Sequence, residues 1–116
     1  MNQILKLKKS SKYTIVDLTT DPKSAVKDAD IVMTDTFTSI HTSDPKRTEK
    51  FLPSFQVNQS LMEKAKNDAI FMHCLPAKRE QEVSSSVIDG PQSVVWDQAE
   101  NRLHSQKALL LSLLSI

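Results

Sequence analysis

The segment Ala69-Ile70-Phe71-Met72-His73-Cys74-Leu75-Pro76 decides the fold of this 116-residue chain. Its first four residues form an apolar run typical of interior parallel strands, and the proline at its end starts a turn. An imidazole and a thiol therefore follow directly on a predicted strand. Because parallel sheets bind their ligands beyond the carboxyl ends of the strands, we expect the chemistry of the protein near His73 and Cys74.

Strand-like and helix-like segments alternate along the chain. Besides residues 69–75, strands are predicted over residues 13–18, 30–35 and 93–96, and helices over residues 22–27, 46–52, 59–66, 84–88 and from residue 97 to the C-terminus. This alternation predicts a three-layer α/β/α fold, with a parallel sheet covered by helices on both faces. The length of the chain leaves room for one domain at most.

Polar residues predict where several of these helices start. Asp21 precedes Pro22, and Asn58 precedes the third predicted helix, so both side chains are expected to cap helices. Asp97 and Glu100 have the spacing of a capping box for the last helix.

The composition excludes several classes of function. Lys and Arg number 15 against 14 Asp and Glu, and no basic block is interleaved with aromatics, so no nucleic-acid partner is predicted. The single cysteine cannot form an internal disulfide, and no N-terminal stretch has a signal peptide's apolar core, so a cytoplasmic location is expected. Residues 108–114 are apolar but too few to span a bilayer. They are predicted to be the buried end of the last helix, and no membrane partner is expected.

A metal site is not predicted either. His73 and Cys74 are adjacent, which makes them poor co-ligands, and the chain has no Cys-x-x-Cys or His-x-x-x-His partner for them.

Two further segments accompany the one that decides the fold: Asp35-Thr36-Phe37-Thr38-Ser39-Ile40 upstream and Asp97-Gln98-Ala99-Glu100-Asn101-Arg102 downstream. In order and spacing the three resemble the ornithine carbamoyltransferase family. In that family one strand ends in Asp-x-x-x-Ser-Met, a later one in His-Cys-Leu-Pro, and an Ala-Glu-Asn-Arg segment opens the last helix. The resemblance covers nearly the whole chain, roughly residues 13–114.

This resemblance implies a transferase that moves a carbamoyl group from carbamoyl phosphate to the side-chain amine of L-ornithine. The products are L-citrulline and phosphate, in arginine biosynthesis or in arginine and ornithine catabolism. The resemblance implies no metal or organic cofactor, and it implies a homotrimer with active sites near the subunit boundaries.

Some parts of the family pattern do not occur in this sequence. The Ser-x-Arg-Thr-Arg and His-Pro-x-Gln segments of the family's N-terminal domain are absent, and a single glycine leaves no Gly-rich loop. Residues 1–116 are therefore interpreted as part of a Rossmann-like ornithine-binding domain without the carbamoyl phosphate domain. We expect such a chain to be inactive alone and to depend on an N-terminal half that is encoded separately.

By resemblance, the ornithine site comprises Asp35, Ser39, Ile40, Cys74 and Leu75. The carboxylate of Asp35 is expected to bind the α-ammonium group. The backbone carbonyls of Cys74 and Leu75 are expected to orient the reacting amine.

The same resemblance assigns carbamoyl phosphate binding to Cys74, Leu75 and Arg102, with Cys74 and Arg102 as the catalytic residues. The planar cation of Arg102 suits the charge that develops on oxygen and phosphate. His73 and Pro76 are expected to shape the turn, with His73 acting through a hydrogen bond rather than as a base. Lys78 and Arg79, which follow the turn, are interpreted as solvated charges.

The residues taken singly leave alternatives open. Asp35 can be a turn or capping residue, Cys74 a buried small hydrophobe, and Arg102 a surface cation paired with a nearby acid. Ile40 and His41 stand where the family has Met and usually Gly, which leaves open a carbamoyltransferase for another amine such as putrescine. A truncated gene product without turnover, or a remnant that only binds an amino acid, is the remaining alternative.

Overall fold

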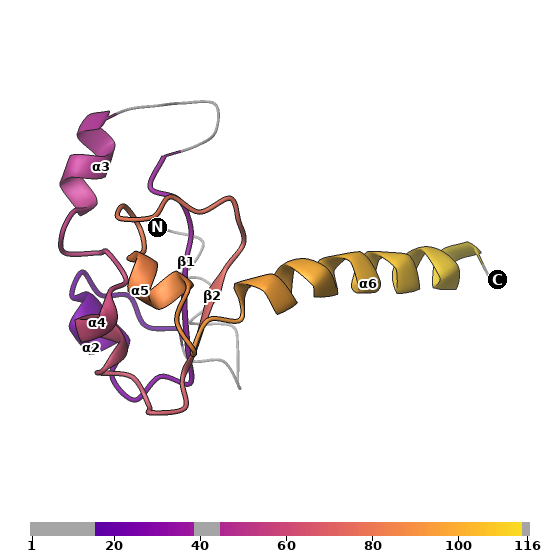
Figure 1. Cartoon of the computed structure of the whole chain (residues 1–116), viewed down its shortest axis with the longest axis horizontal. Helices are drawn as coiled ribbons and strands as arrows, with labels where there is room; N and C mark the ends of the chain where they lie inside the picture. The colour runs from indigo at the N-terminus through magenta and orange to yellow at the C-terminus, as the bar shows by residue number, and fades with distance from the viewer. Residues whose placement is uncertain (1–15, 39–44, 115–116) are drawn as a thin grey trace.

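The computed structural model describes residues 16–38 and 45–114. Within them, two parallel strands, β1 (Ile31–Thr34) and β2 (Ile70–His73), lie side by side at the centre of the molecule (Figure 1). The predicted α/β class with a parallel sheet is confirmed. Both strands are shorter than predicted.

Helices pack around this sheet and extend from it. They are α2 (Pro22–Ala25), α3 (Pro45–Phe51), α4 (Gln59–Met62), α5 (Ser85–Ile88) and α6 (Val95–Leu114). The predicted caps of α2 and α4 are confirmed: the Asp21 carboxylate accepts a hydrogen bond from the Lys23 N–H at 3.0 Å, and the Asn58 side chain accepts one from the Leu61 N–H at 3.1 Å.

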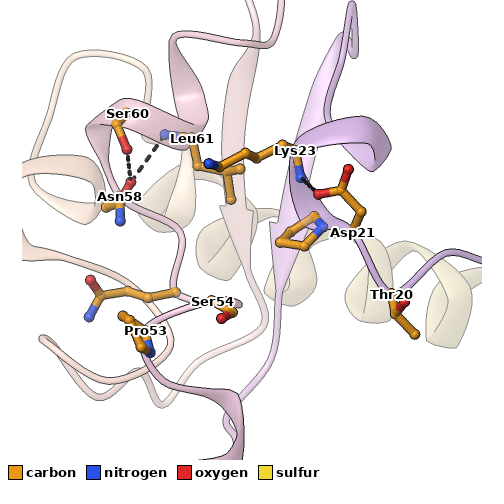
Figure 2. Close-up of a pocket in the computed structure, with 10 residues that line it drawn as sticks. Thr20, Asp21, Lys23, Pro53, Ser54, Asn58, Ser60 and Leu61 are labelled. Atoms are coloured by element: carbon orange, nitrogen blue, oxygen red, sulfur yellow. Dashed lines mark hydrogen bonds between the residues drawn. The ribbon is translucent and has the colours of Figure 1, made fainter.

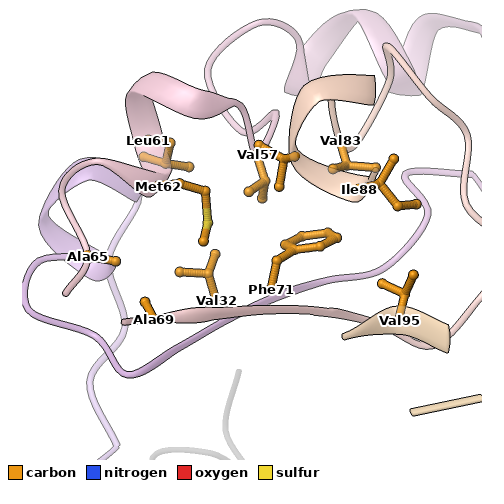
Figure 3. Close-up of a cluster of buried hydrophobic side chains, with 11 residues drawn as sticks. Val32, Val57, Leu61, Met62, Ala65, Ala69, Phe71, Val83, Ile88 and Val95 are labelled. Atoms are coloured by element: carbon orange, nitrogen blue, oxygen red, sulfur yellow. The ribbon is translucent and has the colours of Figure 1, made fainter. Parts of the chain in front are cut away.

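One face of the sheet carries the hydrophobic core. Phe71 on β2 is fully buried, and Val32 lies beside it on β1; both point toward α4 and α5 (Figure 3). The two helices contribute Leu61, Met62, Val87 and Ile88. Each buried side chain of this size stabilises the fold by about 1.5–3 kcal/mol, so the core fixes the sheet against these helices.

The opposite face of the sheet is open over β1. Ile31 and Met33 are 54% and 57% exposed. The helices seen in residues 16–38 and 45–114 thus cover one face of the sheet, and the second outer layer of the predicted α/β/α arrangement is not seen among these residues.

The predicted strand over residues 93–96 is wrong. Ser93 makes only a single parallel bridge to Phe71, and α6 begins at Val95. Val95 is fully buried in the core, and the Gln98 N–H donates to the Val94 carbonyl at 2.9 Å, which closes the first helical turn there. Burial of Val95 therefore starts the helix before the strand can extend.

The capping box predicted for α6 is wrong for the same reason. Because the helix has already begun at Val95, Asp97 lies inside its first turn and is not the N-cap. A carboxylate in the first turn still interacts favourably with the helix dipole.

Residues 108–114 are not the buried helix end that their composition predicts. Leu109, Leu113 and Leu114 are 59%, 71% and 64% exposed. Past its first turn, α6 projects away from the rest of the described chain (Figure 1), so no described element faces these leucines.

Two other predictions differ from the structure in extent. The helix expected over residues 59–66 ends at Met62, after which bonds from the Lys64 and Ala65 N–H groups to carbonyls three residues back tighten the chain into turns. Residues 16–18 form no strand. The earlier part of the strand predicted over residues 13–18 lies outside the described residues.

Gly90, the one glycine of the sequence, lies just after α5 and is expected to resist substitution. A Cβ atom at this position would lie 2.4 Å from the Ser86 carbonyl oxygen, which belongs to α5 and cannot move freely. We therefore expect Gly90→Ala to lower the free energy of unfolding by about 1–3 kcal/mol. Urea denaturation followed by circular dichroism measures this change. Ser105→Ala, on the exposed part of α6, is the control and should change stability by less than about 0.5 kcal/mol. Equal stabilities of the two variants would contradict the steric argument.

The open face of β1 is expected to make the isolated chain self-associate. Exposed Ile31 and Met33 lie on a strand that has no second neighbour among the described residues, and such edges pair with other chains. Replacing both residues by Thr should reduce the association seen by sedimentation velocity at increasing concentration. A parent chain that is monodisperse and unfolds in one cooperative step would overturn this expectation.

Candidate functional site

The register of the sheet brings two predicted site residues together. Thr34 and His73 are the last paired residues of β1 and β2, so Asp35 and Cys74 emerge next to each other at the carboxyl edge. The Cys74 thiol donates a hydrogen bond to the Asp35 carboxylate, with 3.2 Å between Sγ and Oδ1. The Thr36 N–H donates to the same oxygen at 2.7 Å.

These contacts shift the pKa values of Asp35 and Cys74 in opposite directions. The hydrogen bond from Cys74, and after it the one from the Thr36 N–H, lower the pKa of Asp35 below its ordinary value. Burial, followed by the hydrogen bond to Asp35 and its negative charge, raises the pKa of the Cys74 thiol. At neutral pH the pair is therefore a carboxylate and a protonated thiol. This state suits the binding of a cation and not nucleophilic attack by sulfur.

The turn after Cys74 is held by side chains on both sides. The Leu75 N–H donates to His73 Nδ1 at 2.8 Å, which is the kind of hydrogen bond predicted for His73. The His73 N–H in turn donates to Gln98 Oε1, in the first turns of α6, at 3.0 Å. Leu75 has a φ of 54°, in the left-handed region that non-glycine residues rarely occupy. Strained backbone of this kind persists only where its surroundings hold it.

Arg102 lies on the same depression as this turn. The depression has a volume of about 590 Å³ and is lined by Cys74, Leu75, Pro76, Ala77, Arg79, Ile88, Trp96, Ala99 and Arg102. Within the described ranges Arg102 forms no ion pair: Glu100 instead faces His104 at 3.3 Å. The structure thus places Cys74, Leu75, Pro76 and Arg102 around one space, with the Arg102 guanidinium unpaired.

Two predicted ornithine-site residues cannot be placed. Ser39 and Ile40 lie outside the described residues. The chain that leads to them leaves β1 through Thr38, which is buried and accepts a hydrogen bond from Lys78 Nζ at its Oγ1, 2.8 Å away. Lys78, interpreted from the sequence as a solvated charge, therefore joins the loop after β1 to the loop after β2.

Sequence reasoning missed two other residues at this edge. Arg79, also interpreted as solvated, forms a two-point ion pair with Asp89, with Nε and Nη2 at 2.9 and 2.7 Å from its oxygens. Glu82 is fully buried beside His73, with 3.4 Å between its Oε1 and His73 Nε2. No sequence signal marks Glu82, since an acid in the charged run Lys78-Arg79-Glu80-Gln81-Glu82 is typical of a surface loop.

A second hollow lies between α2 and α4 (Figure 2). It has a volume of about 510 Å³ and contains none of the predicted site residues. Two of its polar side chains, Asp21 and Asn58, already cap the helices beside it (Figure 2).

A third hollow, of about 350 Å³, is mainly apolar and has Asp35 in its lining. The rings of Phe37 and Phe51, stacked with centroids 5.1 Å apart, form part of its wall.

Neither a metal site nor a membrane-spanning helix is found among the described residues. In the part of the chain that the structure describes, no three His, Cys, Asp or Glu side chains lie close enough to hold a metal ion. Nor does any described helix combine the length and apolar character that crossing a bilayer requires.

Comparison with known proteins identifies the family to which this chain belongs. The sequence model of the aspartate/ornithine carbamoyltransferase Asp/Orn binding domain matches residues 1–113. The chain belongs to this family. The family features predicted from the sequence, Asp35 directly after one strand and His73-Cys74-Leu75-Pro76 at the end of another, are thus found on neighbouring strands of a family member.

Several relatives are named ornithine carbamoyltransferase. The one from Cenarchaeum symbiosum is 70% identical over 98 residues, which is 84% of this chain and 33% of the relative. The one from Nitrosococcus oceani is 58% identical over 85% of this chain and 33% of the relative. The chain therefore spans about a third of the length of these relatives.

Solved structures of ornithine carbamoyltransferases resemble this chain in fold. The ornithine carbamoyltransferase from Pyrococcus furiosus superposes with a TM-score of 0.71 at 54% identity, covering 78% of this chain and 29% of that one. A mitochondrial ornithine carbamoyltransferase from Coccidioides immitis gives 0.74 at 34% identity, covering 97% of this chain and 35% of that one.

The pairing of Asp35 with Cys74 predicts the reactivity of the thiol. Asp35→Asn removes the charge that raises the pKa of Cys74, so the thiolate fraction at pH 8 should rise and alkylation by iodoacetamide should become a few-fold faster. The reading is unambiguous because the chain has one cysteine. Asp68→Asn, at an exposed position away from the site, is the control and should react like the parent. A slower reaction in Asp35→Asn would show that the carboxylate does not hold the thiol protonated.

Proposed function

We propose that this chain forms the ornithine-binding side of an ornithine carbamoyltransferase active site. The reaction joins the side-chain amine of L-ornithine to the carbonyl carbon of carbamoyl phosphate. A carbon–nitrogen bond forms, the carbon–oxygen bond to phosphate breaks, the amine loses a proton, and citrulline and phosphate leave. The observation that carries the proposal is the contact between Cys74 and Asp35 at the carboxyl edge of two paired strands, on the same side as Arg102.

Binding of the amino-acid end of ornithine falls to Asp35. Its pKa is lowered by the hydrogen bonds from Cys74 and from the Thr36 N–H, so the group stays a carboxylate over the physiological range. It is also exposed, which leaves an oxygen open to an α-ammonium group. Ser39 and Ile40, which follow in sequence, are assigned to the same ligand.

The side-chain amine must lose its proton before it can attack, although a free alkylamine has a pKa of about 10. We assign the Cys74 and Leu75 carbonyls to accept hydrogen bonds from the amine and so aim its lone pair. The protonated Cys74 thiol places no negative charge beside that amine, which favours its neutral form. His73 and Pro76 fix the shape of the turn that carries these carbonyls.

Arg102 is assigned to the carbonyl and phosphate oxygens of carbamoyl phosphate. A guanidinium group stays charged at all physiological pH values and can donate two hydrogen bonds in one plane. The absence of an ion pair to Arg102 among the described residues leaves both available to the substrate. It thereby stabilises the tetrahedral intermediate as negative charge moves onto oxygen.

The rest of the site must come from outside these residues. The chain spans about a third of its relatives' length, so we assign the remaining phosphate contacts to a carbamoyl phosphate domain, in a homotrimer of the family type, in the cytoplasm. The proposal needs no metal or organic cofactor. That domain can be a separately encoded N-terminal half.

Another amine is the second candidate substrate. An N-acetyl-L-ornithine transcarbamylase also superposes on this chain, with a TM-score of 0.67 at 32% identity over 81% of it. Ile40 in place of the family's Met stands on the ligand loop. A panel of ornithine, N-acetylornithine and putrescine separates these substrates.

The test combines this chain with the part of a relative that it does not cover. The chain alone should form no detectable citrulline, because positioning by the absent domain is worth about 7 kcal/mol or more of the barrier. Co-expression with the part of the Cenarchaeum symbiosum relative that this chain does not cover should restore turnover. Arg102→Ala should then lower kcat by about 10²–10³-fold, whereas Lys107→Ala, farther along the same exposed helix, should not.

Each outcome of this test is decisive. Turnover by the chain alone at the rate of a whole relative would contradict the division of the site. A folded, assembled pair that binds both substrates without turnover would favour the non-catalytic alternative. Equal loss in Arg102→Ala and Lys107→Ala would remove Arg102 from the site.

A further inference from the structure

The carboxyl group of Glu82 is buried without a cationic partner. The residue is fully buried, and no Lys or Arg side chain among the described residues pairs with it. Its Oε1 accepts a hydrogen bond from the Lys78 N–H at 2.5 Å and lies 3.4 Å from His73 Nε2, while neither Oε2 nor His73 Nε2 has a hydrogen-bond partner in the described part of the chain. Burial of an acid in this way is costly. A well-packed apolar side chain would stabilise such a position as well or better, so core stability does not account for Glu82.

The tautomer of His73 links this acid to the turn at the proposed site. His73 Nδ1 accepts the Leu75 N–H at 2.8 Å and therefore carries no proton. In the neutral imidazole the proton then sits on Nε2, the nitrogen that faces Glu82 Oε1. An acceptor at Oε1 favours this tautomer, and the tautomer in turn permits the bond to Leu75.

Glu82 also contacts the chain on the far side of the turn. Lys78, whose N–H it accepts, follows the turn, and His73 precedes it. The two contacts from one carboxyl oxygen thus lie on either side of Cys74, Leu75 and Pro76. Leu75, which has a φ of 54°, lies between these two contacts.

We propose that Glu82 is a positioning residue for the amine-binding turn and acts through His73. It fixes the His73 tautomer, which holds the Leu75 N–H and so sets the direction of the Cys74 and Leu75 carbonyls. The role given to these carbonyls rests on the proposed function; the link from Glu82 through His73 to Leu75 does not.

Glu82→Leu tests the link by removing the acceptor. Both contacts use Oε1, so Leu takes that oxygen away from the Lys78 N–H and from His73 Nε2. Without it the His73 proton is free to move to Nδ1, and the bond from the Leu75 N–H is then lost. Glu82→Gln, whose amide oxygen can occupy the position of Oε1, is the conservative variant and should keep both contacts. Glu63→Gln, at an exposed position, is the control.

The first readouts use the chain alone and need no catalysis. In the parent and in Glu63→Gln, imidazole ¹⁵N spectra should show His73 protonated on Nε2 and not on Nδ1. Glu82→Leu should reverse this tautomer or free the Leu75 amide proton for exchange. It should also displace the pH profile of Cys74 alkylation, which a general loss of stability would not move in a protein that is still folded.

His73→Asn provides a second route if Glu82→Leu does not fold. The Asn oxygen can take the place of Nδ1 and accept the Leu75 N–H, but it cannot reach Glu82. The Cys74 profile should shift in this variant too, since the turn has lost its connection to Glu82.

In the co-expressed pair, Glu82→Leu should lower kcat/KM for ornithine by about 10- to 100-fold, the cost of a small misplacement of reacting groups. The KM for carbamoyl phosphate should stay close to that of Glu63→Gln. A failure of all pairs to turn over would count against the proposed function alone, because the spectra and the alkylation profiles still decide the link.

The proposal is overturned if a folded Glu82→Leu keeps the parent's His73 tautomer, Leu75 amide protection and Cys74 profile. It is equally overturned if His73→Asn leaves the Cys74 profile unchanged.

Discussion

The in-register pairing of β1 with β2 is the constraint on which the rest of the structure depends. It ends at Thr34 and His73, so the next residues, Asp35 and Cys74, come within hydrogen-bond distance without any further device. A slip of one residue would turn every side chain of the strand to the other face. Phe71 or Val32, whichever lies on the strand that slips, would then leave the core, and this free-energy cost protects the geometry of the site.

Part of this arrangement could be predicted from the sequence, because strand ends and helix caps depend on neighbouring residues. Asn58 was expected to cap α4 and does so, and Asp35 and Cys74 were expected at strand ends. Predictions failed where burial decided the outcome. Buried Val95 starts α6 ahead of Asp97, and the leucines after residue 108 were predicted to be buried although no described element faces them.

The site divides in the same way. Family motifs indicated Asp35, Cys74 and Arg102, whereas Glu82 and Lys78 are recognised only from their three-dimensional neighbours. The side-chain partner of Lys78 lies on the loop after β1, and that of Glu82 lies at the end of β2, at sequence distances that show no period. A motif names the residues that contact a substrate more readily than those that hold them in place.

The protonated state of Cys74 has a consequence for the durability of such a protein. The thiolate is the form that attacks peroxide and disulfides, so a thiol whose pKa is raised by partial desolvation of its sulfur atom and by Asp35 is oxidised slowly. Cys74 is exposed and is the sole cysteine of the chain, which would ordinarily make it the first residue to form a sulfenic acid or a mixed disulfide. The Asp35 carboxylate thus protects Cys74 from oxidation. The sulfur atom can therefore remain at an open site as a hydrogen-bond donor.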